Sequence, residues 1–121
     1  MNTTIAPVRT IQDIQLDLIE LASFNEFDGA QVKQDLIENR DLWKGAIIGR
    51  FDNSQLIPLR DIASNIWNVD TLMILPQEGK EKELLELAVT WRPDELDLQE
   101  GKEVAMLYGN GESKVVRVWW D

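Results

Sequence analysis

The sequence contains neither cysteine nor histidine among its 121 residues. The lack of cysteine excludes disulfide bonds, thiolate nucleophiles and cysteine-based metal sites. The lack of histidine removes the commonest general base and the commonest transition-metal ligand, which excludes Ser-His-Asp and Cys-His catalytic arrangements. We therefore expect no cofactor and no stoichiometric zinc or iron.

Long apolar runs are also missing, and no stretch approaches the length needed to cross a bilayer. Residues 1–10 lack the charged and apolar regions of a signal peptide. These features predict a cytoplasmic protein without a membrane partner. Apolar residues make up 44% of the chain, enough for a core, and the length suits one domain. We expect a single α/β domain over residues 1–121.

Basic residues are scarce: 12 lysines and arginines face 22 acidic residues, giving a formal net charge of -10. The excess lies in residues 1–41 (eight acids, three bases) and residues 77–103 (nine acids, four bases), where helices are expected. The simplest interpretation is that these acids are solvated helix faces. The alternative is an acidic surface that docks a basic protein or mimics nucleic acid. Direct nucleic-acid binding is not expected, because phosphate contacts need a basic face.

Two helices are expected in the first third of the chain. Thr10 fits an N-cap with an acid three residues on, which predicts a helix over residues 11–23. Asp28 is the next N-cap candidate, and its helix is expected to end near Asn39. The apolar residues at helical spacing are Ile11, Ile14, Leu18, Leu21 and Ala22 in the first helix and Val32, Leu36 and Ile37 in the second.

The pattern then changes to short apolar runs. Residues 45–51 and 55–59 flank an Asp-Asn-Ser turn, which predicts a β-hairpin. Pro58 lacks a backbone donor, so the second arm should be an edge or irregular strand. Residues 61–68 are a connector with room for one helical turn. Residues 69–75 are apolar at nearly every position, which predicts a central strand buried on both faces.

Four further elements are expected after this strand. A helix over residues 79–91 must stop before Pro93, because the residue before a proline avoids helical geometry. Residues 94–98 alternate polar and apolar, as in a half-exposed strand at or near a sheet edge. Residues 102–108 are interpreted as a short helix, and residues 113–120 as the last strand.

A repeated pentapeptide connects these elements. The sequence Gln-Glu-Gly-Lys-Glu occurs at residues 77–81 and 99–103, each time between an expected strand and an expected helix. The resulting β-α-β-α-β order favours a mixed sheet of about five strands, in which 69–75 and 114–120 are parallel. The alternative makes residues 103–120 a hairpin that turns at Gly109-Asn110-Gly111.

One set of acidic residues is a candidate metal site. Ligands of open parallel sheets gather at the carboxyl ends of the strands, where Glu78, Glu100 and Asp121 are expected. Three carboxylates suit Mg²⁺ or Ca²⁺, which prefer oxygen ligands. The simpler interpretation is that Glu78 and Glu100 complement helix N-termini and that Asp121 is only the last residue.

Two adjacent tryptophans near the end of the chain are the other candidates. Successive residues of a strand point to opposite faces, so Trp120 shares a face with Val116 and Val118, while Trp119 shares the other with Arg117. If that second face is open, Arg117 and Trp119 form an aromatic–cationic pair suited to a binding partner. If both faces are covered, both rings belong to the core.

No residue pattern identifies a reaction. We therefore expect a small non-enzymatic accessory or regulatory protein that binds either another protein or a second copy of itself. The alternative is a small enzyme or sensor that uses a carboxylate-bound divalent cation. An exposed Trp–Arg patch would favour binding, and convergent carboxylates in a cleft would favour the cation.

Overall fold

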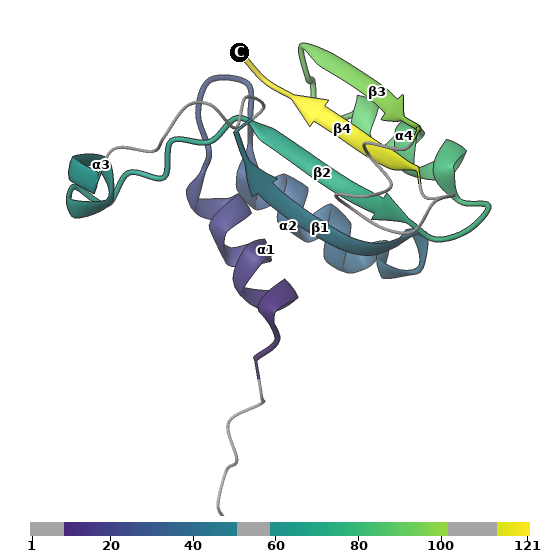
Figure 1. Ribbon diagram of the computed structural model, residues 1–121, viewed down its shortest axis with the longest axis horizontal. Helices are drawn as coiled ribbons and strands as arrows, with labels where there is room; N and C mark the ends of the chain where they lie inside the picture. The colour runs from purple at the N-terminus through teal and green to yellow at the C-terminus, as the bar shows by residue number, and fades with distance from the viewer. Residues whose placement is uncertain (1–8, 51–58, 102–113) are drawn as a thin grey trace, which may run out of the picture.

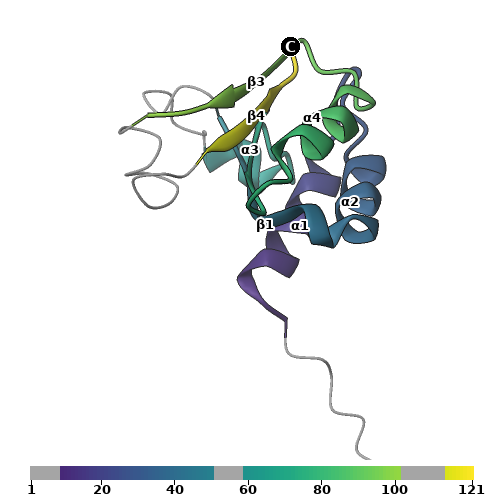
Figure 2. The same ribbon diagram turned by 90° about the vertical axis from the view of Figure 1, so that its right-hand side faces the viewer.

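Two layers make up the fold, a four-stranded sheet and the helices α1, α2 and α4 packed on one of its faces (Figures 1 and 2). The structure is a computed structural model that describes residues 9–50, 59–101 and 114–121. The elements in chain order are α1 (Ile11–Leu21), α2 (Gly29–Glu38), the 3₁₀ turn η1 (Arg40–Leu42), β1 (Trp43–Gly49), α3 (Leu59–Ala63), β2 (Thr71–Pro76), α4 (Glu81–Val89), β3 (Glu95–Gln99) and β4 (Val115–Trp119).

The N-terminal helices begin at the residues that the sequence predicts. Thr10 and Asp13 form a capping box, and the Asp28 side chain accepts a hydrogen bond from the Gln31 amide. The two helices meet closely at Gly29, where a Cβ would lie 2.1 Å from the carbonyl oxygen of Ile19. Only glycine fits this contact without a backbone shift. In the part of the chain described, no helix is long and apolar enough to span a membrane.

The sheet has the strand order β1-β2-β4-β3, and every neighbouring pair is antiparallel. The α/β class is confirmed, but the five-stranded mixed sheet is wrong, and so is the parallel pairing of 69–75 with 114–120. The helix α4 does connect two strands of the same direction, β2 and β3, but β4 lies between them. The reason is burial: β4 is buried at four consecutive positions, whereas β3 carries acidic residues and suits an edge.

The positions of the individual strands agree only in part with the sequence-based predictions. Strand β2 is central and β3 is at an edge, as the sequence predicts. The first run of the expected hairpin forms β1, which pairs with β2, and Leu59 begins α3 instead of ending a strand. The rest of that hairpin's second arm lies outside the described residues. So do the expected helix 102–108 and the alternative turn at Gly109-Asn110-Gly111, and a single domain over the whole chain stays a prediction.

The glycine of the repeated pentapeptide has a positive φ in both copies, and residues 102–103 of the second copy lie outside the described residues. Gly79 has a φ of +81° and Gly101 has a φ of +109°. Residues other than glycine rarely adopt this backbone conformation. The first copy leads from β2 into α4, which begins at Glu81. The glycine of each copy is therefore required by its backbone conformation.

The core lies between the helices and one face of the sheet. Trp120 stacks on Phe27 with ring centroids 4.1 Å apart, and its Nε1 donates to the Trp91 carbonyl at 3.0 Å. Trp43 is likewise buried and donates to the Leu36 carbonyl at 2.9 Å. Both indoles therefore bury a large apolar surface while their single donor stays satisfied.

The outer edge of β1 is closed by side chains of α1. Gln12 donates to the Ala46 carbonyl and accepts from the Ala46 amide, both at 2.8 Å. Gln15 accepts from the Ile48 amide at 3.1 Å. Backbone groups at a sheet edge otherwise offer a template for strand addition. The two glutamines therefore fix α1 beside the sheet and occupy these backbone groups of β1.

Candidate interaction surface

The two adjacent tryptophans occupy opposite faces of β4 and its continuation. Trp120 is fully buried on the helix-covered face, which confirms its predicted place in the core. Trp119 lies on the other face and is partly buried, opposite Thr71 on β2 and Glu95 on β3. The predicted role of Trp119 in binding a partner stays a prediction.

Arg117 shares that face but is not an exposed cation. Its side chain is 7% exposed, and its Nη2 donates to Asp97 Oδ2 at 2.7 Å and to Glu95 Oε1 at 2.8 Å. Partial burial alone would raise the pKa of Asp97, but hydrogen bonds from Arg117 and Gln99 and the charge of Arg117 outweigh it and lower that pKa. The guanidinium therefore holds β3 against β4, and the expectation of an exposed Arg117–Trp119 pair is wrong for Arg117.

The three carboxylates of the candidate metal site do not come together at one edge. Glu78 and Glu100 follow the parallel strands β2 and β3, but β4 runs the other way, so Asp121 lies beside Asp94 at the opposite end of β3. The length of β3, roughly 16 Å, separates Glu100 from Asp121. Glu100 instead pairs with Lys114 at 3.5 Å. Within the described ranges, no three acidic residues are grouped closely enough to hold a metal ion.

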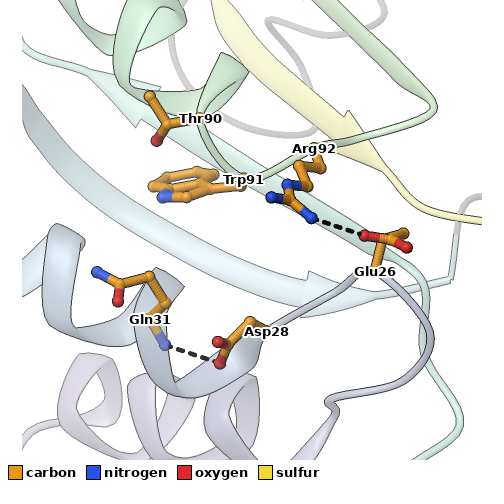
Figure 3. A pocket seen from close by; sticks show the side chains of 6 residues that line it. All are labelled: Glu26, Asp28, Gln31, Thr90, Trp91 and Arg92. Carbon is orange, nitrogen blue, oxygen red and sulfur yellow. Dashed lines mark hydrogen bonds and ion pairs between the residues drawn. The ribbon is translucent and has the colours of Figure 1, made fainter.

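A shallow hollow of about 300 Å³ lies between the start of α2 and the end of α4 (Figure 3). The polar groups around it have partners in the protein: Arg92 pairs with Glu26 at 3.3 Å, and Asp28 caps α2. The indole of Trp91 donates to Asp35 at 2.8 Å. The bonds of Arg92 and Trp91 join the segment after α4 to α2 and the loop before it, so the hollow is best explained by the packing of these elements.

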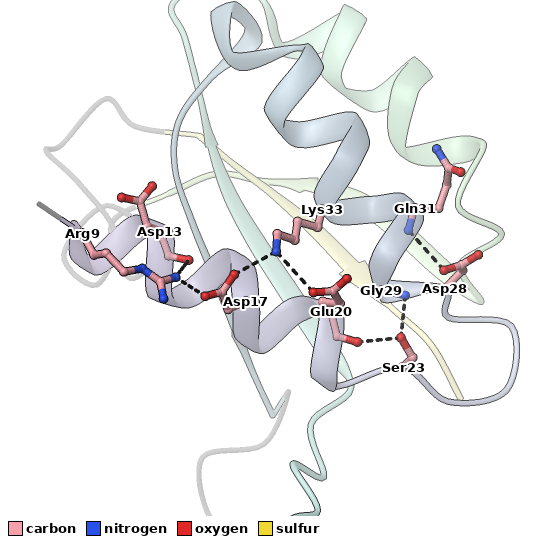
Figure 4. Close-up of polar contacts among 9 residues, drawn as sticks. All are labelled: Arg9, Asp13, Asp17, Glu20, Ser23, Asp28, Gly29, Gln31 and Lys33. Atoms are coloured by element: carbon pink, nitrogen blue, oxygen red, sulfur yellow. Dashed lines mark hydrogen bonds and ion pairs between the residues drawn. The ribbon is translucent and has the colours of Figure 1, made fainter. Parts of the chain in front are cut away.

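Charged residues tie α1 to α2 on the side away from the sheet (Figure 4). Lys33 of α2 donates to Asp17 at 2.8 Å and to Glu20 at 3.3 Å, and Arg9 pairs with the same Asp17. The hydrogen bonds from Arg9 and Lys33 lower the pKa of Asp17, and its hydrogen bond raises the pKa of Lys33. Asp13, Asp17 and Glu20 outnumber these two cations, so this border of α1 keeps an acidic excess.

A second apolar face of α1 is left largely exposed by the described residues. Its residues are spaced 3, 4 and 3 apart, the a/d spacing of helices that pack against another helix. By helical spacing this face lies between the acidic border and the glutamines that bind β1. Leu18 is partly buried, but the other three side chains are half-exposed or more. We call this face the outer stripe; it consists of Ile11, Ile14, Leu18 and Leu21.

A second exposed apolar feature is the segment 59–66, which we call the arm. It contains α3 and the turn that follows, and it stands apart from the sheet and the other helices (Figure 1). Leu59 is 84% exposed, and Ile62 and Ile66 are about half-exposed. Just beyond the arm, Trp67 packs against the core. The residue that follows the arm therefore packs against the core, while the aliphatic side chains of the arm itself are half-exposed or more.

The sequence predicts helix α1 but not which of its faces is buried. The residues singled out by their spacing were mostly those of the outer stripe, whereas the core takes Leu16, Ile19 and Ala22. The signal was present: α1 has apolar residues on more of its circumference than one buried face requires. An excess of this kind predicts a helix with two contacts, one of which the described fold supplies.

Comparisons with protein-family models, with curated proteins and with solved structures find no match for this chain.

Proposed function

We propose that this chain is a small non-enzymatic accessory or regulatory protein that acts by binding protein, either another protein or a second copy, through the outer stripe of α1. The observation that carries the proposal is the pair of apolar faces on one helix. The inner face, with Leu16 and Ile19, already packs into the core. The outer stripe leaves Ile11, Ile14 and Leu21 half-exposed or more.

The spacing of the outer stripe supports binding over chance exposure. Single apolar residues on a surface are normal, but a contiguous patch on one helix is typical of an interaction site. The a/d spacing is the pattern that a partner helix or turn would fit. The edge of β1 is a poorer candidate, because Gln12 and Gln15 already bind its backbone.

The proposal also covers the location of the protein and the partners that it does not bind. The proposed setting is the cytoplasm, and neither nucleic acid nor a membrane is proposed as a partner, because the chain is strongly acidic. No contact among the described residues favours the cation-dependent enzyme or sensor. Trp119 stays a second, independent candidate contact on the far face of the sheet.

The experiment is a pull-down with tagged protein from native lysate supplemented with an untagged, isotope-labelled copy of the chain. Leu21→Glu is compared with Val89→Glu. The two residues are matched: each is the last residue of its helix, and they are 64% and 62% exposed. The proposal predicts that Val89→Glu captures the same proteins as the wild type, and that Leu21→Glu loses at least one of them or the labelled copy. Identical capture by all three would contradict it.

A further inference from the structure

We infer that the outer stripe of α1 is covered by the arm of a second copy of this chain, in a two-fold symmetric dimer in which each copy gives one arm and receives one. This inference rests on the proposed function, because it names the occupant of the same stripe. Both halves of the contact lie in the described part of the chain: an apolar strip on α1 that the described residues leave largely exposed, and an apolar arm whose helix stands apart from the sheet and the other labelled helices (Figure 1).

The dimensions of the two features are compatible. The outer stripe spans the length of α1 from Ile11 to Leu21, about 15 Å at the helical rise. The helix of the arm, Leu59–Ala63, is about half as long. Its exposed Leu59 and Ile62 are one helical turn apart, so both can face a single strip of aliphatic side chains. The arm therefore fits lengthwise on the stripe.

The local charges also favour this pairing. Arg60 projects from the arm with 87% of its side chain exposed, and its contact with Asp61 is loose at 3.7 Å. The border of the outer stripe carries Asp13, Asp17 and Glu20 against Arg9 and Lys33, which leaves one carboxylate in excess. The guanidinium of an incoming arm would lie beside this acidic border.

The contact area of the proposed dimer is small. Each arm and each stripe offers three large aliphatic side chains that are half-exposed or more. Two arms on two stripes enclose a surface on the order of 1,000 Å², the lower limit for a specific interface. Interfaces near this limit are typical of weak, transient association, so we expect a reversible dimer with a dissociation constant on the order of micromolar or above.

The net charge gives this dimer a distinctive salt dependence. Two copies that each carry a formal charge of -10 repel each other over long range. Salt screens this repulsion, whereas it leaves the apolar contact intact. Self-association should therefore strengthen from low to moderate salt. A basic protein bound to the same stripe would show the opposite dependence.

The experiment measures the molar mass of the purified full chain over a wide concentration range by sedimentation equilibrium. Leu21→Glu on the stripe and Ile62→Glu on the arm should each weaken the dimer by roughly a hundredfold, because each substitution enters the symmetric interface twice. The matched Val89→Glu should leave the association constant unchanged. Circular dichroism melting curves confirm that all variants remain folded.

Mixing the two variants identifies the contact itself. The mixed dimer of Leu21→Glu with Ile62→Glu has one intact arm–stripe contact and one that carries both substitutions. One Glu already removes the apolar gain of the contact that it enters, so a second Glu in that same contact costs little more. The mixed dimer should therefore form up to about tenfold more strongly than either variant alone. If stripe packs on stripe, or arm on arm, mixing gives no such gain and the inference is wrong. If the wild type is monomeric at every concentration while Leu21→Glu still loses lysate proteins, the inference fails but the proposed function stands.

Discussion

The two apolar faces of α1 consist of the same residue types but differ in what covers them. On the inner face, Leu16 and Ile19 are buried against α2 and the sheet. On the outer stripe, Ile14 and Leu21 stay half-exposed or more. Hydrophobicity alone therefore does not mark the core; the neighbouring elements decide it. The fold needs one of these faces, which leaves the other available for a second protein surface.

The adjacent tryptophans at the end of β4 repeat this contrast. Trp120 stacks on Phe27, and its indole donor is satisfied by Trp91. Trp119 lies on the opposite face of the sheet from α1, α2 and α4 and is only partly buried. The inner ring belongs to the fold, while the outer ring is available for a role in binding.

The largest expected difference in stability is between variants of these two tryptophans. Trp120→Ala should lower the free energy of unfolding by about 3–5 kcal/mol, because it empties a large buried site. Trp119→Ala should cost clearly less, because part of the ring is already in water. Urea denaturation followed by circular dichroism measures both. Equal losses, with binding unchanged in Trp119→Ala, would place both rings in the core and remove Trp119 as a candidate contact.

The same comparison on α1 should give the next largest effect. Ile19→Ala is expected to lower the free energy of unfolding by about 2–5 kcal/mol. Leu21→Ala, on the outer stripe, should stay within roughly 0.5 kcal/mol of the wild type for the monomer. Chemical denaturation at low protein concentration separates this effect from association. A large loss for Leu21→Ala would show that the stripe is covered within the monomer.

The junction of α1 and α2 allows a sharper test of the inner face. Gly29→Ala places a Cβ against the Ile19 carbonyl oxygen and should destabilise the fold by about 1–3 kcal/mol. Gly49→Ala is the control, since a Cβ there meets nothing within 4 Å. The melting temperatures of both variants give the comparison. Similar values would mean that the helices do not approach as closely as described.

A smaller effect on stability is expected from the ion pairs on the face of the sheet opposite α1, α2 and α4. The pKa of Asp97 is lowered in the folded state, so its contribution to stability is present above the unfolded pKa and is lost as the pH falls through the folded pKa. Asp97→Asn should therefore make the fall in stability below about pH 4 less steep. Asp41→Asn, an exposed carboxylate before β1, serves as the control. If the free energy of unfolding falls equally steeply with decreasing pH in Asp97→Asn and in the wild type, the ion pair does not contribute as described.

Local signals predicted much of the secondary structure. Helix ends depend on interactions within a few residues, so the sequence predicts them well. Examples are the caps at Thr10 and Asp28 and the helix end before Pro93. Sheet order is different, because it depends on which strands can be buried together. The insertion of β4 between β2 and β3 follows from burial on both faces, and it separated the carboxylates of the predicted metal site. Arg117 was misjudged for the same reason, since its partners lie on β3.

The most direct test of the account is methyl NMR of the isoleucine-labelled chain during dilution from high to low micromolar concentration. A dimer through these surfaces predicts that the resonances of Ile14 on the outer stripe and Ile62 on the arm shift together with concentration. Those of the buried Ile19 and Ile74 should stay fixed, because the monomer core is unchanged. Ile14 and Ile62 signals that stay constant over the whole range would contradict self-association through these surfaces.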